Sequence, residues 1–178
     1  LIKAASTFSD DKKEVYRQAI GRETVKTAKW VLKTTLNNAL VAEQNRSPLC
    51  DDSGIPHLFL EIGPNHNVDG ALLSFIKQGV AEGLRALPGR PMAIKGDDTQ
   101  RIDQSGGLDF DPGALLSAPI LLKPTDEDVL RLHILMHGGG PEIRGKTFRV
   151  FHRHKVSVVT EEIIEWAVEA SGKLGCSP

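Results

Sequence analysis

The amino-acid sequence predicts an α+β fold, in which a small mixed β-sheet is covered by helices within a single domain. The chain has 178 residues, which corresponds to one domain and is long enough to bury a sizeable core. Apolar segments of strand length cluster in the sequence, and segments with a helical apolar period lie before and after them. No internal repeat and no low-complexity tract is present.

Composition and charge exclude several classes of protein. The 22 Lys and Arg residues balance 23 Asp and Glu residues, so no whole-chain field exists to hold nucleic acid or an anionic membrane surface. No apolar run approaches the ~18 residues of a membrane span. The two cysteines, Cys50 and Cys176, are too few for the disulfide framework of a secreted protein. We therefore expect a cytoplasmic protein with no nucleic-acid partner and no membrane partner.

The N-terminal part of the chain predicts two helices. Ser9 and the acidic residues after it form the expected cap and first turn of a short helix that ends at Gly21. A longer helix is expected over residues 23–45, because apolar side chains recur there at three- and four-residue steps on one face. These side chains are Val25, Ala28, Leu32, Leu36, Ala39 and Leu40.

The middle of the chain predicts a loop, a strand and a helix. Pro48 ends the long helix, and residues 50–54 form a polar turn before an expected strand at residues 58–62. Apolar residues at helical spacing then predict a helix over residues 68–87, which ends at Pro88.

The later part of the chain predicts most of the sheet and a last helix. Residues 95–113 are polar and rich in Asp and Gly, which is typical of a surface loop. Thr160 is the expected cap of a final helix that ends near Gly172. Strands are expected at residues 118–123, 129–137 and 147–154.

A short turn, Cys50-Asp51-Asp52-Ser53-Gly54, concentrates groups that carry out chemistry. It holds a thiol, two carboxylates and a hydroxyl. The alternative interpretation is a capped loop with a buried thiol. The turn on its own is weak evidence for a site and favours the capped loop.

Three consecutive glycines, Gly138, Gly139 and Gly140, follow an apolar strand directly. They suit a backbone that turns tightly or approaches a ligand closely, and they are equally compatible with a long hairpin connection. Cys176, beyond the final helix, would by itself be a packing residue.

The histidines give a weaker signal. His152 and His154 are two residues apart on an expected strand, and together with Arg149 and Arg153 they form a polar face. This face is either a solvated sheet edge or a surface that meets a partner. Ligands at paired short spacing are missing, so a zinc site is not supported.

Taken together, these segments resemble one enzyme family. Residues 48–54, which read Pro-Leu-Cys-Asp-Asp-Ser-Gly, are similar to the Pro-Ile-Cys-Gln-Asp-Thr-Gly signature of the class I iron–sulfur fumarate hydratases and L-tartrate dehydratases, in their α subunit or α-type domain. Residues 137–142 stand in place of the family's Lys-Gly-Gly-Gly-Ser-Glu loop, and residues 175–178 in place of its Ala-Cys-Pro-Pro end. The resemblance covers residues 1–178, and we expect an α-type domain that is incomplete at its C-terminus.

This resemblance implies a [4Fe–4S] cluster as cofactor. Three thiolates would hold the cluster, and the iron without a protein ligand would act as a Lewis acid on a substrate hydroxyl. Cys50 and Cys176 resemble two of the ligands, and the third is not in this chain.

The resemblance also implies roles for other residues. Asp52 matches the family's aspartate beside the cluster and is the candidate acid–base group. Arg90 stands where the family places an arginine that binds a substrate carboxylate, with Arg85 close by as the alternative. The other candidate substrate-binding residues are Asp51, Gly138, Gly139 and Gly140.

The activity implied by the resemblance is that of a hydro-lyase, which adds or removes water on a small 2-hydroxy acid such as malate or tartrate. Activity would require a β-type subunit or C-terminal domain, and we expect an oligomer. The alternative is a diverged, non-catalytic relative that acts as a structural or ligand-binding partner. The missing third cysteine favours it, as do Asp51 where the family has glutamine and His137 where it has lysine.

Overall fold

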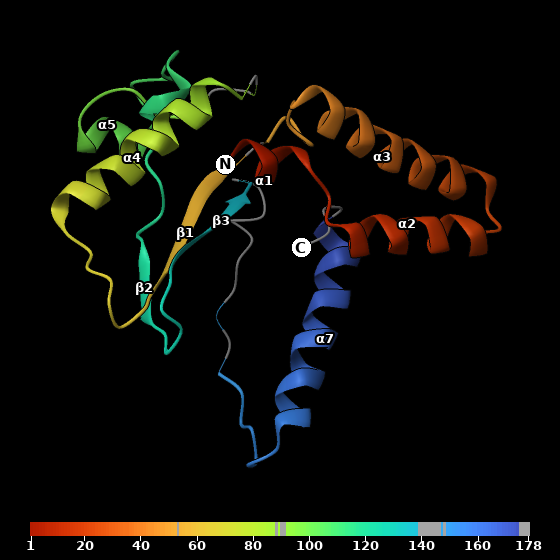
Figure 1. The fold of residues 1–178 in the computed structure, drawn as a ribbon. Helices are drawn as coiled ribbons and strands as arrows, with labels where there is room; N and C mark the ends of the chain where they lie inside the picture. The colour runs from red at the N-terminus through yellow and green to blue at the C-terminus, as the bar shows by residue number, and fades with distance from the viewer. Residues whose placement is uncertain (53, 88, 90–91, 139–146, 148, 175–178) are drawn as a thin grey trace. The chain divides into compact units, whose positions relative to one another are not determined.

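The structure is a computed structural model that describes residues 1–52, 54–87, 89, 92–138, 147 and 149–174. The chain divides into two units, Leu1–Gly138 and Gly139–Pro178, which are considered separately. In chain order, the first unit contains α1 (Ile2–Ser6), α2 (Asp10–Arg22), α3 (Lys26–Asn45), β1 (Ile55–Ile62), α4 (Gly70–Arg85), α5 (Asp98–Asp103), the 3-10 turn η1 (Pro112–Ala114), β2 (Leu121–Pro124) and β3 (Leu130–His137) (Figure 1). The described part of the second unit contains α7 (Val156–Leu174).

β1 is the central strand of a three-stranded sheet with the order β2-β1-β3. It runs parallel to β2, with Phe59 opposite Leu121, and antiparallel to β3, with Ile55 opposite His137. A parallel pair needs a long crossover connection, and the chain between β1 and β2 supplies one that includes α4. The prediction of an α+β fold with a small mixed sheet is confirmed.

One face of the sheet packs against α4. Pro56, Leu58 and Leu60 alternate along β1 with less buried residues, so they point to the same face. Leu58 joins Val80 and Leu84 of α4 in the core cluster, and side chains of β3 pack against it. Burial of these apolar side chains removes them from water and stabilises the contact between sheet and helix.

The N-terminal helices form a second layer of contacts. Lys13 of α2 is only 8% exposed, and its Nζ lies 2.7 Å from a carboxylate oxygen of Glu43 in α3.

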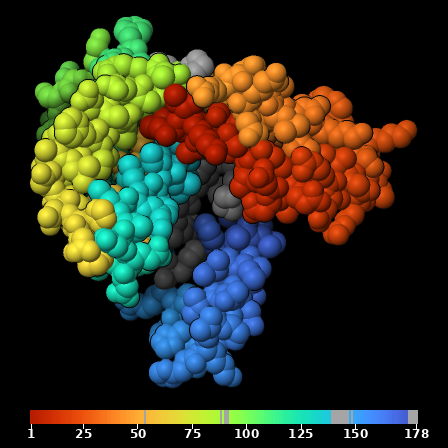
Figure 2. Space-filling view, in the orientation of Figure 1, coloured from red at the N-terminus to blue at the C-terminus, as the bar shows by residue number. Residues whose placement is uncertain are grey.

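α1, which the sequence does not predict, lies between α4 and the end of α3 (Figure 2). A groove of about 500 Å³ is found there. Its lining includes Leu1, Lys3, Ser6, Glu43, Arg46, Gly79 and Gly83.

The prediction of a strand at residues 147–154 is wrong for the residues of this range that the structure describes. Thr147 and residues 149–154 are not in a strand, and the chain turns at residues 152–155, where the N–H of Lys155 donates to the carbonyl of His152 at 2.8 Å. Arg153 and His154 have φ angles of 47° and 57°. Two successive residues in the left-handed region reverse the chain, which is incompatible with an extended strand.

The last helix begins earlier than expected, at Val156 rather than after Thr160. The hydroxyl of Thr160 donates to the carbonyl of Val156 at 3.1 Å, so this residue lies inside the helix and does not cap it. The expected surface loop over residues 95–113 contains α5, which begins with a capping box between Asp97 and Gln100.

None of the helices in the described part of the chain combines the length and the apolar composition that a membrane span requires.

Candidate functional site

The turn that follows α3 is held at its start by two neighbouring helices. The N–H of Leu49 donates to the carbonyl of Ala5 in α1 at 2.9 Å, and Nδ2 of Asn38 in α3 donates to the carbonyl of Leu49 at 2.9 Å. Cys50 follows directly after this anchor and is exposed. The sequence therefore places the cysteine on a fixed segment with its thiol accessible.

The two carboxylates of the turn lie in different environments. Asp51 is exposed, whereas Asp52 is half-buried. Ser53 lies outside the described residues. A half-buried carboxylate is better placed than an exposed one to act on a bound substrate in a site that excludes water.

Gly54 ends the turn in close contact with the end of β3. Its φ angle is +91°, and a Cβ atom built on it would lie 2.3 Å from the carbonyl carbon and oxygen of His137 and 2.6 Å from the amide nitrogen of Gly138. Only glycine tolerates both the positive φ and the close approach. On its other side, the N–H of Gly54 donates to Sδ of Met92 at 3.3 Å.

The structure thus brings the turn and the first glycine of the glycine loop together. Ile55 pairs with His137 in the sheet, which places Gly54 beside Gly138. Gly139, Gly140, Arg90 and Cys176 lie outside the described residues, so their expected places in the site stay predictions.

A pair of histidines lies beside the turn, and sequence reasoning did not identify it. The rings of His57 and His137 are 5.5 Å apart, edge to face. These residues come from neighbouring antiparallel strands, and their proximity depends on the register between β1 and β3, which the sequence alone does not give. In the residues that the structure describes, no group of three or more His, Cys, Asp or Glu side chains is arranged to hold a metal ion.

Arg85, the alternative to Arg90 as a carboxylate-binding residue, is occupied by a structural contact. Its Nε and Nη2 donate to the two carboxylate oxygens of Asp111 at 2.9 and 2.8 Å. This pair raises the pKa of Arg85 and lowers the pKa of Asp111, because each charge stabilises the other. Arg85 therefore ties α4 to η1, and Arg90 is the better candidate for a substrate carboxylate.

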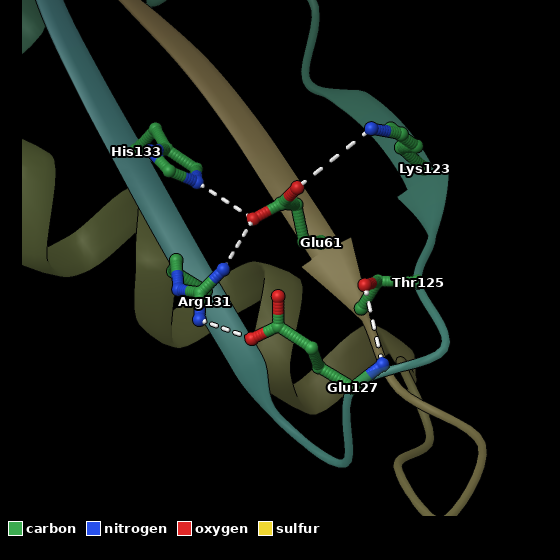
Figure 3. Close-up of polar contacts among 6 residues, drawn as sticks. All are labelled: Glu61, Lys123, Thr125, Glu127, Arg131 and His133. Atoms are coloured by element: carbon green, nitrogen blue, oxygen red, sulfur yellow. Dashed lines mark hydrogen bonds and ion pairs between the residues drawn. The ribbon is translucent and has the colours of Figure 1, made fainter.

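A second cluster of charged residues lies near the other end of β1 (Figure 3). The usual rise of a strand per residue puts Glu61 ~20 Å along β1 from Gly54. Oε2 of Glu61 accepts hydrogen bonds from His133 Nε2 and Arg131 Nη1, each at 2.9 Å, and Arg131 also donates to Glu127 at 2.8 Å. The bonds from His133 and Arg131 lower the pKa of Glu61. The cluster links neighbouring strands and is separate from the turn.

Comparisons with known proteins agree with the resemblance carried by the turn. The family model described as fumarate hydratase (Fumerase) matches residues 1–178. A protein of Methanocaldococcus jannaschii named "Putative L(+)-tartrate dehydratase subunit alpha" is 33% identical over 93 residues, which make up 51% of this chain and 33% of that protein. The match thus spans about one third of the relative's length. The predicted resemblance is confirmed, and the chain belongs to the fumarate hydratase (Fumerase) family.

Proposed function

We propose that this chain is the α-type part of a hydro-lyase, an enzyme that reversibly adds or removes water on a small 2-hydroxy acid. The observation that carries the proposal is the contact of Gly54 with His137 and Gly138, because it joins the cysteine- and aspartate-bearing turn to the start of the glycine loop. Membership of the fumarate hydratase family supports it. The name of the M. jannaschii relative supports a substrate of the tartrate type.

The proposed roles follow from the chemistry of the turn. Asp52 transfers the proton that accompanies loss or gain of the hydroxyl group, a role for which its half-buried position is suitable. Arg90 binds a substrate carboxylate by a charge-assisted hydrogen bond. The backbone N–H groups of Gly138, Gly139 and Gly140 approach the substrate, and Asp51 lines the same site.

Cys50 and Cys176 are the residues of this chain that would hold a [4Fe–4S] cluster. An exposed thiol at the head of an anchored turn fits the donor type that such a cluster requires. When bound, the cluster supplies a Lewis acid for the departing hydroxyl. The sequence contains two cysteines, so a third thiolate has to come from outside these 178 residues.

A β-type subunit or domain is part of the proposal, because the remaining carboxylate-binding groups and the carbon base are expected there. We further propose that the complex is oligomeric and cytoplasmic and that it acts without nucleic acid. The balanced charge of the chain supports the absence of a nucleic-acid partner, and its low cysteine count supports a cytoplasmic location.

The role of Asp52 leads to the test of this function. In a complex reconstituted anaerobically with a β-type partner, Asp52→Asn should lower kcat for malate or tartrate by ~10²–10⁴-fold, because it removes proton transfer. The iron content should stay near that of the unmodified chain. Asp126→Asn, which changes an exposed carboxylate between β2 and β3, is the matched control and should leave kcat unchanged.

If Asp52→Asn lost iron and activity in equal measure, Asp52 would be a structural residue of the turn. The alternative function, a non-catalytic relative that binds a ligand or a partner, is favoured by Asp51 and by His137. It predicts that the complex contains no iron or sulfide after anaerobic purification. A stoichiometric cluster would reject that alternative.

A further inference from the structure

The amide of Gly54 has an unusual hydrogen-bond acceptor. Gly54 is buried, and its N–H donates to the thioether sulfur of Met92 at 3.3 Å. Sulfur is a weak acceptor, but a buried N–H that loses its partner bears the full cost of its desolvation. β1 begins at Ile55, one residue after Gly54. Met92 therefore supplies the acceptor for the Gly54 N–H just before the strand begins.

Gly54 also lies against backbone atoms of a neighbouring strand. The carbonyl of His137 lies where a side chain would begin, so Gly54 contacts both this strand end and the sulfur of Met92. The start of the turn is fixed separately by the bond from Leu49 to Ala5. Cys50 and Asp52 lie between these two fixed points.

Water is poorly suited to replace the sulfur. A cavity of about 20 Å³ borders Gly54 and Met92, which is room for one water molecule at most. Its lining is dominated by apolar side chains, among them Leu84, Leu87 and Leu115. A water molecule needs two to four polar partners, and the lining residues that the structure describes offer few.

We propose that Met92 is a positioning residue for the turn. Its sulfur holds the N–H of Gly54 and thereby keeps the end of the turn that carries Cys50 and Asp52 beside His137 and Gly138. The claim that this hydrogen bond matters for turnover rests on the proposed function. The claim that Met92 holds Gly54 in place does not.

The test exchanges one atom at position 92. The chain has two methionines, and Met136, on β3, packs against the core cluster without an assigned role in the turn. The full chain carrying Met136→Leu is produced with methionine, selenomethionine or norleucine, so that these residues occupy position 92. Selenium keeps an acceptor, whereas norleucine has a similar shape and no acceptor. The measurement is the hydrogen exchange rate of the Gly54 amide by NMR.

Norleucine should raise the exchange rate of the Gly54 amide tenfold or more over methionine, while the amides of α4 keep their rates. Selenomethionine should restore slow exchange. In the unmodified background, Met92→Leu should speed the exchange of Gly54 and Met136→Leu should not. Equal rates with norleucine and methionine would overturn the proposal, and so would a rise shared by the whole chain, which would make Met92 a packing residue.

A second measurement tests the consequence for catalysis. In the complex with the β-type partner, norleucine at position 92 should lower kcat at least threefold with little change in KM, and selenomethionine should restore it. An unchanged kcat despite faster exchange of Gly54 would reject the positioning role. An inactive complex with methionine would count against the proposed function, and the exchange rates would still decide whether Met92 holds the turn.

Discussion

Gly54 determines where the candidate catalytic turn meets the sheet. Its positive φ and its approach to the His137 carbonyl leave no space for a side chain. The sequence motif identifies the glycine, but it does not identify the strand that presses against it. That information depends on the pairing of Ile55 with His137, two residues far apart in the chain.

Gly54→Ala should therefore destabilise the chain by about 2 kcal/mol or more, because the new Cβ meets backbone atoms that cannot turn aside. The measurement is the free energy of unfolding in urea. Gly21→Ala, in α2, is the control: among the described residues, a Cβ atom built there meets no heavy atom within 4 Å beyond its chain neighbours and its own helix backbone, so a gain of ~0.5–1 kcal/mol is expected. Similar effects of the two substitutions would contradict the close contact at Gly54.

Residues of the site differ in how far the sequence could predict them. Cys50, Asp52 and Gly54 were found because they are adjacent in a motif. Met92 was not, because it reaches the turn only through a tertiary contact, and nothing near it in the sequence marks that contact. Side chains that support a motif from distant segments require knowledge of register and packing.

At the scale of elements, the apolar period predicted the long helices and most of the sheet. α3 and α4 lie close to the expected ranges because each presents an apolar stripe to a core. The error at residues 147–154 arose because short, partly alternating segments fit both a strand and an irregular segment. Left-handed residues that are not glycine, here Arg153 and His154, leave no sequence signal for the turn that they form.

The hydrogen bonds from β3 to Glu61 of β1 lead to a prediction about how stability depends on pH. Hydrogen bonds from His133 and Arg131 lower the pKa of Glu61 below its usual 4.5. A carboxyl whose pKa is lowered in the folded state contributes stability above its unfolded pKa and loses it as the pH falls through the folded value. Glu61→Gln should therefore destabilise the chain most above about pH 4.5.

The difference in unfolding free energy between the unmodified chain and Glu61→Gln should shrink as the pH is lowered below that value. Urea titrations across this range measure it. Glu127→Gln is the matched control. Glu127 is more exposed than Glu61, and it accepts a hydrogen bond from Arg131 but not from His133. A difference that grew toward acid pH would mean that the carboxylate of Glu61 is not stabilised by its partners.

At the scale of the whole molecule, the chain carries only part of the proposed reaction. The turn supplies a thiol and a candidate acid–base group, but Arg131 and Arg85, two of the cations that could bind a dicarboxylate, are held by Glu61, Glu127 and Asp111. The aligned segment covers 33% of the M. jannaschii protein. These observations support the proposal that a β-type partner supplies the remaining carboxylate-binding groups.

The isolated chain should consequently show no turnover of malate or tartrate, even when purified anaerobically with iron and sulfide. Addition of a β-type partner should produce activity, because it brings the carbon base and the remaining carboxylate clamp to the turn at Cys50 and Asp52. The chain with Asp52→Asn, combined with the same partner, controls for activity that belongs to the partner alone. Turnover by the unmodified chain without a partner would mean that the base lies within these 178 residues, and its identity would then have to be sought among the groups beside the turn, with His57 and His137 first.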